Sequence, residues 1–128
     1  MKPSTHEWIK KAESDYQAAL ALSRLRKLTF HDEACFHCQQ SAEKYIEARL
    51  EEADIRFQKT HDLDMLLQGV LPVEPMWAAL LPALLRLNRY AVRFRSPGNE
   101  ATAKNAKDSV KDAKTVRKEV RLAPGLNV

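Results

Sequence analysis

The sequence predicts an all-α protein, an up-and-down bundle of four or five helices. Apolar side chains recur at steps of three and four residues through several long segments, as expected for helices with one buried face. The 128 residues contain only three glycines, which argues against a loop-rich fold. Short connections between the segments favour antiparallel neighbours. The length fits one domain, residues 1–128, with enough chain to bury a core.

Composition excludes some classes of protein and leaves others open. With 45% hydrophobic and 30% charged residues, the chain has the composition of an ordinary globular protein. No apolar run approaches the ~18 residues of a membrane span, and residues 1–7 lack the apolar core of a secretory signal. We therefore expect no membrane association and a cytoplasmic location.

The net charge of +4 is unevenly distributed. Residues 1–64 carry 10 Lys and Arg against 12 Asp and Glu, whereas residues 65–128 carry 11 against 5. A basic half can face nucleic acid or an acidic partner. The alternative is that acidic and basic helices of one chain lie beside each other.

The first helix is expected from Ser4 to about Lys27. Ser4 and Glu7 have the spacing of a capping box, in which both side chains satisfy backbone N–H groups. Asp15 lies at the edge of the apolar stripe. A carboxylate there either pairs with a cation of a neighbouring helix or has a functional role.

The second helix is expected over residues 32–53. Its period places Cys35, Cys38 and Ile46 on an apolar face and His37, Gln40 and Lys44 on an opposite, exposed face. The cysteines form a C-x-x-C pair without the second ligand pair that zinc requires or the βαβ context of a redox site, so we interpret both as core side chains. Gln39 lies near the apolar stripe, which suggests a hydrogen bond across a helix pair or a subunit boundary.

Two helices are expected in the middle of the chain. Thr60 is a candidate cap for a short third helix that ends at Gly69. A longer helix follows from about Pro75 to Arg93. Proline removes a backbone donor, so Pro82 predicts a kink or a break into two pieces.

The last helix is expected over residues 100–121, with Asn99 as its cap. Its predicted core face is made of small residues, which lets a neighbouring helix approach closely: Ala103, Ala106, Val110, Ala113, Val116 and Val120. Beside that face a basic stripe repeats at steps of three and four: Lys104, Lys107, Lys111, Lys114, Lys118 and Arg121. The stripe is either a solvated surface, a seam with a partner or a nucleic-acid contact.

Three stretches together resemble the HEPN domain family. They are Phe-His-Cys-Gln-Gln-x-Ala-Glu-Lys over residues 36–44, Lys-Thr-His-Asp-Leu over 59–63 and Leu-Asn-Arg-Tyr-Ala-Val over 87–92. The resemblance implies a helical bundle, a homodimer, and pairing with a separately encoded minimal nucleotidyltransferase in a two-component, toxin–antitoxin-like system.

The resemblance also sets an expectation for chemistry. Many HEPN proteins resemble metal-independent ribonucleases, with an Arg followed after four to six residues by a His near the start of the last long helix. Here Arg89, Arg93 and Arg95 occupy that region, but no histidine follows His61. Arg56 and His61 have the right spacing but lie between the second and third helices. We therefore predict no catalytic residue, and no cofactor or metal.

Binding chemistry remains. The candidate ligands of a nucleotide or RNA phosphate are His37, Gln40, Lys44, Arg89, Arg93 and Arg95, which offer hydrogen-bond donors and guanidinium forks. No Gly-rich phosphate loop is present. Two alternatives stay open: an endoribonuclease that uses one of these arginines with an unusual base, His37 or His61, and a non-catalytic helical adaptor.

Overall fold

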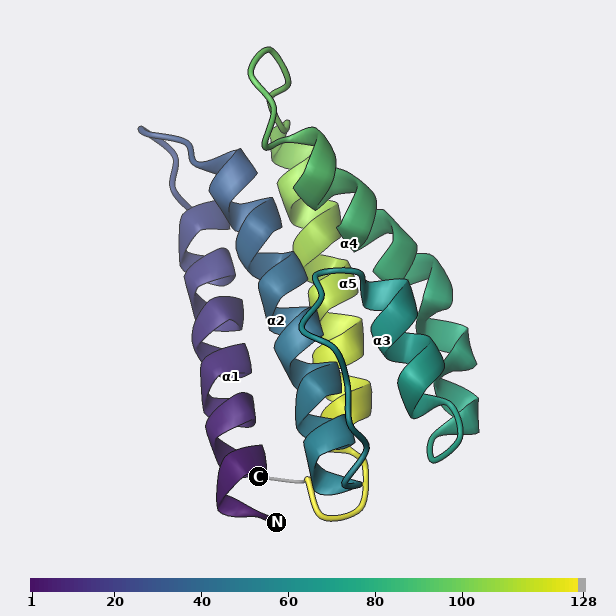
Figure 1. Cartoon of the computed structure of the whole chain (residues 1–128). Helices are drawn as coiled ribbons and strands as arrows, with labels where there is room; N and C mark the ends of the chain where they lie inside the picture. Colours follow the sequence, from purple (N-terminus) through teal and green to yellow (C-terminus); the bar gives the residue numbers. More distant parts are fainter. Residues whose placement is uncertain (127–128) are drawn as a thin grey trace.

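The computed structural model describes residues 1–126, which form a bundle of antiparallel helices without a strand (Figure 1). The all-α prediction is confirmed. The elements are α1 (Pro3–Ser23), α2 (His31–Glu52), α3 (Leu63–Val70), the 3₁₀ helix η1 (Pro75–Leu80), α4 (Leu81–Arg93) and α5 (Ala103–Arg121). None of the described helices is long and apolar enough to span a bilayer.

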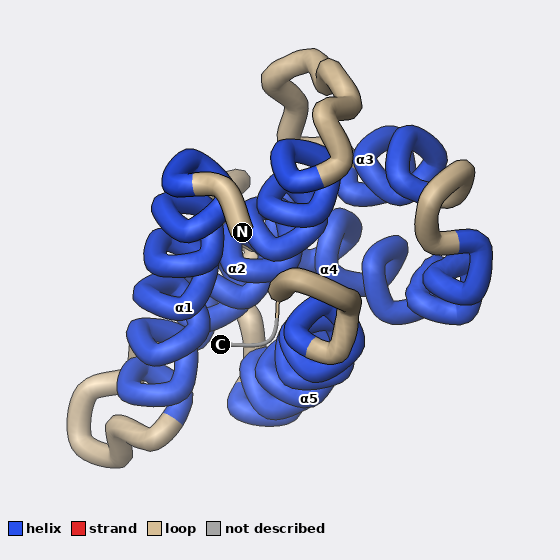
Figure 2. Tube along the Cα trace, turned by 90° about the horizontal axis from the view of Figure 1, so that it is seen from below, coloured by secondary structure: helices blue, strands red, loops and turns tan. Residues whose placement is uncertain are grey.

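Helix α2 lies at the centre of the bundle and contacts α1, α3, α4 and α5. Figure 2 shows α1 on one side of it, α4 on the other and α5 beneath it. The two-sided pattern expected for α2 is therefore only half right. Cys38 and Ile46 are buried as predicted, but Gln40 and Glu47 on the opposite face are buried as well. Neighbours surround the helix on almost every side.

Helix α1 starts and ends differently from its sequence prediction. Its hydroxyls do not cap it: Ser4 Oγ donates to Glu51 and Thr5 Oγ1 donates to Glu52, each over 2.8 Å. These bonds tie the start of α1 to the end of α2. The helix also stops at Ser23, four residues before Lys27.

Capping residues were misassigned at α3 and α5, although the helices themselves were predicted. Asp62 caps α3 by accepting from the amide of Asp64, and α3 continues through Gly69 to Val70. At α5 a capping box of Thr102 and Asn105 replaces the expected Asn99 cap. In each case a competent side chain stands two or three residues nearer the helix.

The break at Pro82 is confirmed. Residues 75–80 form η1, and Pro82 lies in the first turn of α4, where a missing backbone donor costs no hydrogen bond. The bend lets Trp77 and Leu84 both enter the main core, where each is at most 2% exposed.

The small residues of α5, which could have packed against another chain, lie mostly in the core of this chain. Ala113, Val116 and Val120 of α5 are fully buried within this chain, although Ala103 is exposed. Both cysteines are buried and free, as predicted. The small-residue face of α5 is thus a seam inside the bundle, where α5 packs against α2.

One ionic group closes the seam between α1 and α5. Glu13 accepts two hydrogen bonds from Arg117, at 2.6 and 2.9 Å, and one from the Tyr45 hydroxyl at 2.6 Å. Burial opposes ionisation, but hydrogen bonds from Arg117, Tyr45 and Gln17 outweigh it and lower the pKa of Glu13 to about 2. The Glu13 carboxylate therefore stays charged and joins α1 to α5.

Candidate phosphate-binding site

Three of the six predicted site residues are engaged inside the bundle. Asp15 of α1 accepts from both His37 Nδ1 at 2.8 Å and Lys44 Nζ at 2.6 Å, which confirms its expected ion pair. Gln40 is buried and donates to the side-chain oxygen of Gln39 at 2.8 Å. The expectation that these side chains form an exposed face was wrong, because α1 and the segment after α2 cover that side.

The three arginines are exposed, and none forms a salt bridge with a described residue. Arg93 lies over the ring of Phe94 at 5.6 Å, and Arg95 lies over the ring of Phe36 at 5.3 Å. Stacking of a guanidinium on an aromatic face limits its motion but leaves its N–H groups available. The arginines therefore retain their donors, unlike His37 and Lys44.

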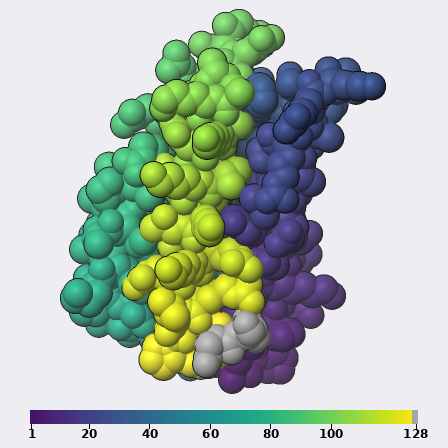
Figure 3. All heavy atoms as spheres, turned by 180° about the vertical axis from the view of Figure 1, so that it is seen from behind, coloured from purple at the N-terminus to yellow at the C-terminus, as the bar shows by residue number. Residues whose placement is uncertain are grey.

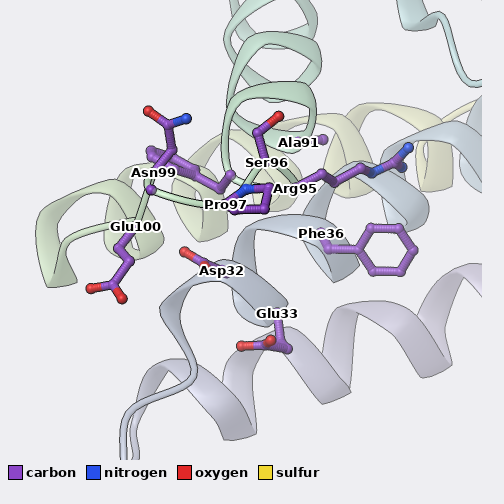
Figure 4. A pocket seen from close by; sticks show the side chains of 11 residues that line it. Asp32, Glu33, Phe36, Ala91, Arg95, Ser96, Pro97, Asn99 and Glu100 are labelled. Carbon is purple, nitrogen blue, oxygen red and sulfur yellow. The ribbon is translucent and has the colours of Figure 1, made fainter.

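Arg95 lines two neighbouring pockets. The first, here the His61 pocket, has a volume of about 430 Å³ and is lined by Gln39, Thr60, His61, Asp62, Asn88, Ala91, Val92 and Arg95. The second, the Phe36 pocket, measures about 520 Å³ and shares Ala91 and Arg95 with the first. In Figure 4 Arg95 and Phe36 lie at one end of the Phe36 pocket, Glu100 and Asp32 lie toward the other, and Glu33 lies between them.

Helix α2 holds His61 through two side chains one turn apart. Gln39 Nε2 donates to the backbone oxygen of His61 at 2.8 Å, and Glu43 Oε1 lies 2.8 Å from His61 Nδ1. Because an ionised carboxylate can only accept, Nδ1 donates this bond. The other ring nitrogen, Nε2, has no hydrogen bond to a described residue, and the side chain is 61% exposed. The Glu43 contact thus orients the ring and leaves Nε2 free for a ligand.

The segment around His61 is fixed at its other end by α4. Asn88 accepts from the amide of Leu63 and donates to Asp62, at 3.1 and 3.0 Å. Thr60 Oγ1 accepts from the amide of Asp62 at 3.1 Å. The amides of Asp62, Leu63 and Asp64 are therefore already bonded. A ligand of this pocket has to be held by side chains, chiefly Arg95 and His61.

A second glutamate lies one turn beyond Glu43. Glu47 is 4% exposed, and its Oε1 has no hydrogen-bond partner among the described residues. Burial, and next the charge of Glu43, raise the pKa of Glu47 to about 7. The carboxyl of Glu47 is therefore mostly uncharged below about pH 7.

The structure puts His61 in one pocket with Arg95, which is among the arginines that the endoribonuclease alternative combined with His61. Arg56 lines two other pockets, each together with Phe57, and does not line the His61 pocket. Arg95, 34 positions after His61, shares the pocket instead. The roles of Glu43 and Asn88 were missed, although both lie in the stretches that carry the family resemblance.

Within residues 1–126 no group of three or more His, Cys, Asp and Glu side chains has the arrangement of a metal site. The arrangement offers a free guanidinium, an oriented imidazole and an exposed aromatic ring along one edge of α2 and α4. A phosphate suits the first two, and a flat ring suits the third.

Comparison with known proteins identifies the family. Searches among curated proteins and among solved structures gave no significant match. The family model described as HEPN domain matches residues 5–123, which includes every helix that builds the two pockets. The chain therefore belongs to the HEPN domain family.

Proposed function

We propose that this HEPN protein binds the phosphate of a nucleotide or an RNA strand in the His61 pocket. The observation that carries the proposal is Arg95, an exposed guanidinium that pairs with no carboxylate of residues 1–126 and lines the same pocket as an oriented histidine. Arginine presents planar donors that match phosphate oxygens two at a time. Stacking on Phe36 supports it in place before a ligand arrives.

His61 complements the arginine. Its bond to Glu43 directs Nε2 away from α2, and histidine is the side chain whose charge changes near neutral pH. When protonated, Nε2 donates to a phosphate oxygen. Asp62 also lines the pocket, but its Oδ1 already accepts from Asp64 and Asn88, which moderates its repulsion of an anion.

The Phe36 pocket supplies a place for the base. Phe36 is 36% exposed, so a base can stack on its ring. Such stacking accepts any of the four bases, because every base has a flat face. Carboxylates at the far end of this pocket can accept from amino groups of a base or from ribose hydroxyls. A nucleotide would then place its phosphate beside Arg95 and its base toward Phe36. Arg89 and Arg93 of α4 line neither pocket and would add long-range attraction only.

Family membership supports a second part of the proposal. We propose that the protein is a homodimer and pairs with a minimal nucleotidyltransferase in a toxin–antitoxin-like system. Gln39 gives no support for the dimer, because its side chain donates to His61 and accepts from Gln40 within the same chain. Multi-angle light scattering tests the dimer. Affinity purification of the tagged protein from its own organism tests the pair: recovery of a minimal nucleotidyltransferase supports it, and its absence among the recovered proteins counts against it.

An endoribonuclease is the second candidate, and the Glu43–His61 contact favours it. A base at Nε2 could take the proton of a ribose 2′-hydroxyl while Arg95 stabilises charge on the phosphate. Cleavage of single-stranded RNA in EDTA that is lost in both His61→Ala and Arg95→Ala would establish this activity. Intact RNA with retained binding supports the binding function instead.

The central experiment measures affinity for AMP, UMP and a short single-stranded RNA. Arg95→Ala should weaken each by about 10- to 100-fold, because a charged hydrogen bond contributes roughly 1.5–3 kcal/mol. Lys10→Ala, which removes an exposed cation of α1, is the matched control and should retain affinity. Equal affinity in the wild type and in Arg95→Ala would reject the site.

A further inference from the structure

Helix α5 carries a row of lysines that the pockets do not use. Lys104 pairs with Asp108 at 2.8 Å, and Arg121 turns toward Glu13 at 3.3 Å. The four between them, Lys107, Lys111, Lys114 and Lys118, are exposed and form no salt bridge with a described residue. The structure thus reduces the basic stripe of the sequence to these four, here called the lysine row.

The lysine row is narrow and straight. At about 100° per residue, its four side chains fall within an arc of about 60°. At about 1.5 Å per residue, the row extends about 16 Å along the helix. The acidic neighbours Asp108 and Glu119 lie about 60–80° beyond one edge of this arc, and Asp112 turns inward to bond Arg86.

The row lies on the opposite side of the bundle from the His61 pocket. Helix α5 runs down the middle of the face in Figure 3, which views the molecule from behind. In Figures 1 and 2 the segment that carries His61 crosses the other side of α2. The row is therefore not an extension of the proposed phosphate site.

We infer that the lysine row binds the backbone of a single-stranded RNA, independently of base sequence. Lysines neutralise phosphates as point charges, and one straight row fits the phosphates of one strand. At about 3.4 Å per stacked nucleotide, 16 Å covers about five phosphates. The choice of RNA rather than DNA as the ligand rests on the proposed function. The lysine row itself is present whether or not that function is correct.

An acidic protein fits the row less well. Lysine is depleted from the cores of protein interfaces, which favour aromatic, Met and Arg side chains. No aromatic residue occurs in α5, and its apolar residues Ala113, Val116 and Val120 are already buried in the bundle. A surface of lysines without an apolar centre suits a polyanion held by charge.

The test measures how RNA affinity depends on salt. Each phosphate neutralised in a single strand contributes about −0.7 to the slope of log affinity against log salt, so four lysines contribute about −3. A fourfold rise in salt should then weaken the wild type by about 50-fold through the row alone. The variant with Lys107, Lys111, Lys114 and Lys118 changed to Gln should lose this part of the slope. It should also bind a 12-nucleotide single-stranded RNA at least about tenfold more weakly.

The matched control removes four exposed cations elsewhere: Lys10, Lys11, Arg26 and Lys27 changed to Gln. This variant has the same net charge as the first and should keep most of the slope. An equal loss in both variants would mean that net charge, not the row, attracts RNA. Tighter binding of a duplex or of poly-glutamate than of single-stranded RNA would also overturn the inference. Circular dichroism checks that both variants stay helical.

The two sites can fail separately. The lysine-row variant should bind AMP as the wild type does, because the His61 pocket is untouched. Arg95→Ala should lose AMP while keeping most of the RNA salt slope. Loss of the slope alone therefore tests the row, and loss of AMP alone tests the pocket.

Discussion

The seam between α1 and α5 and the pocket between α2 and α4 use the same kinds of side chain in opposite ways. In the seam Glu13 bonds Arg117 and Tyr45, so every charge meets a partner. In the pocket Arg95 and the Nε2 atom of His61 have donors or acceptors that no described residue uses. The first arrangement stabilises the fold. The second leaves chemistry available to a ligand.

Two glutamates, the half-buried Glu13 and the buried Glu47, show the same contrast. Glu13 accepts four hydrogen bonds from three residues, and its pKa falls to about 2. Oε1 of Glu47 accepts none from the described residues, and the pKa of Glu47 rises to about 7. Burial disfavours the charge of both. The number of hydrogen-bond donors decides which one stays ionised.

Replacing the better-paired glutamate should have the largest effect on stability. Glu13→Gln should lower the free energy of unfolding at pH 7 by about 2–3 kcal/mol, because it leaves Arg117 without its carboxylate. The folded-state pKa is depressed below the usual 4.5, so this stability is present above pH 4.5 and is lost as the pH falls toward 2. Urea denaturation at pH 7 and pH 3 measures both. A variant as stable as the wild type at pH 7 would contradict this account of the seam.

Glu47→Gln should have the opposite sign. The folded-state pKa of Glu47 lies above its usual value, so the folded protein binds the extra proton and the wild type loses stability as pH rises from 4.5 to 7. The amide removes this cost, and the variant should be more stable at pH 8 by about 2 kcal/mol. At pH 4 the difference should nearly vanish. A pH-independent difference in melting temperature would show that Glu47 is not a buried, unpaired acid.

A smaller effect is expected where α2 holds the pocket. Gln39→Met keeps the volume but removes the donor to the His61 backbone, which should cost about 1 kcal/mol of stability. AMP affinity should fall by a few-fold, since His61 loses one of its two anchors. Differential scanning calorimetry measures the stability of this variant, and titration calorimetry measures its affinity for AMP. Unchanged AMP affinity would mean that the position of His61 does not matter for binding.

Much of the fold followed from the sequence because helical periodicity is local. The segments of α1, α2 and α5 were located within a few residues, and the break at Pro82 follows from the chemistry of proline alone. Helix caps were harder to predict from the sequence. The hydroxyls of Ser4 and Thr5 can either cap α1 or bond another helix, and the outcome depends on Glu51 and Glu52, which are distant in the chain.

The site was only partly predictable. Arg95 was among the candidates because it precedes a turn in the family-like region, and the structure places it at a pocket. His37 and Lys44 were misplaced because periodicity gives the faces of a helix but not the number of its neighbours. His61 was a candidate base for Arg89, Arg93 or Arg95, and only the fold shows that Arg95 is the one that shares its pocket.

The most direct test is the affinity of AMP for the wild type, Arg95→Ala and Lys10→Ala, measured by calorimetry beside the unfolding free energy of each. The account predicts AMP binding that falls about 10- to 100-fold in Arg95→Ala alone, with stability unchanged. Arg95→Ala that binds AMP as well as the wild type, or that loses AMP only because it unfolds, would contradict it.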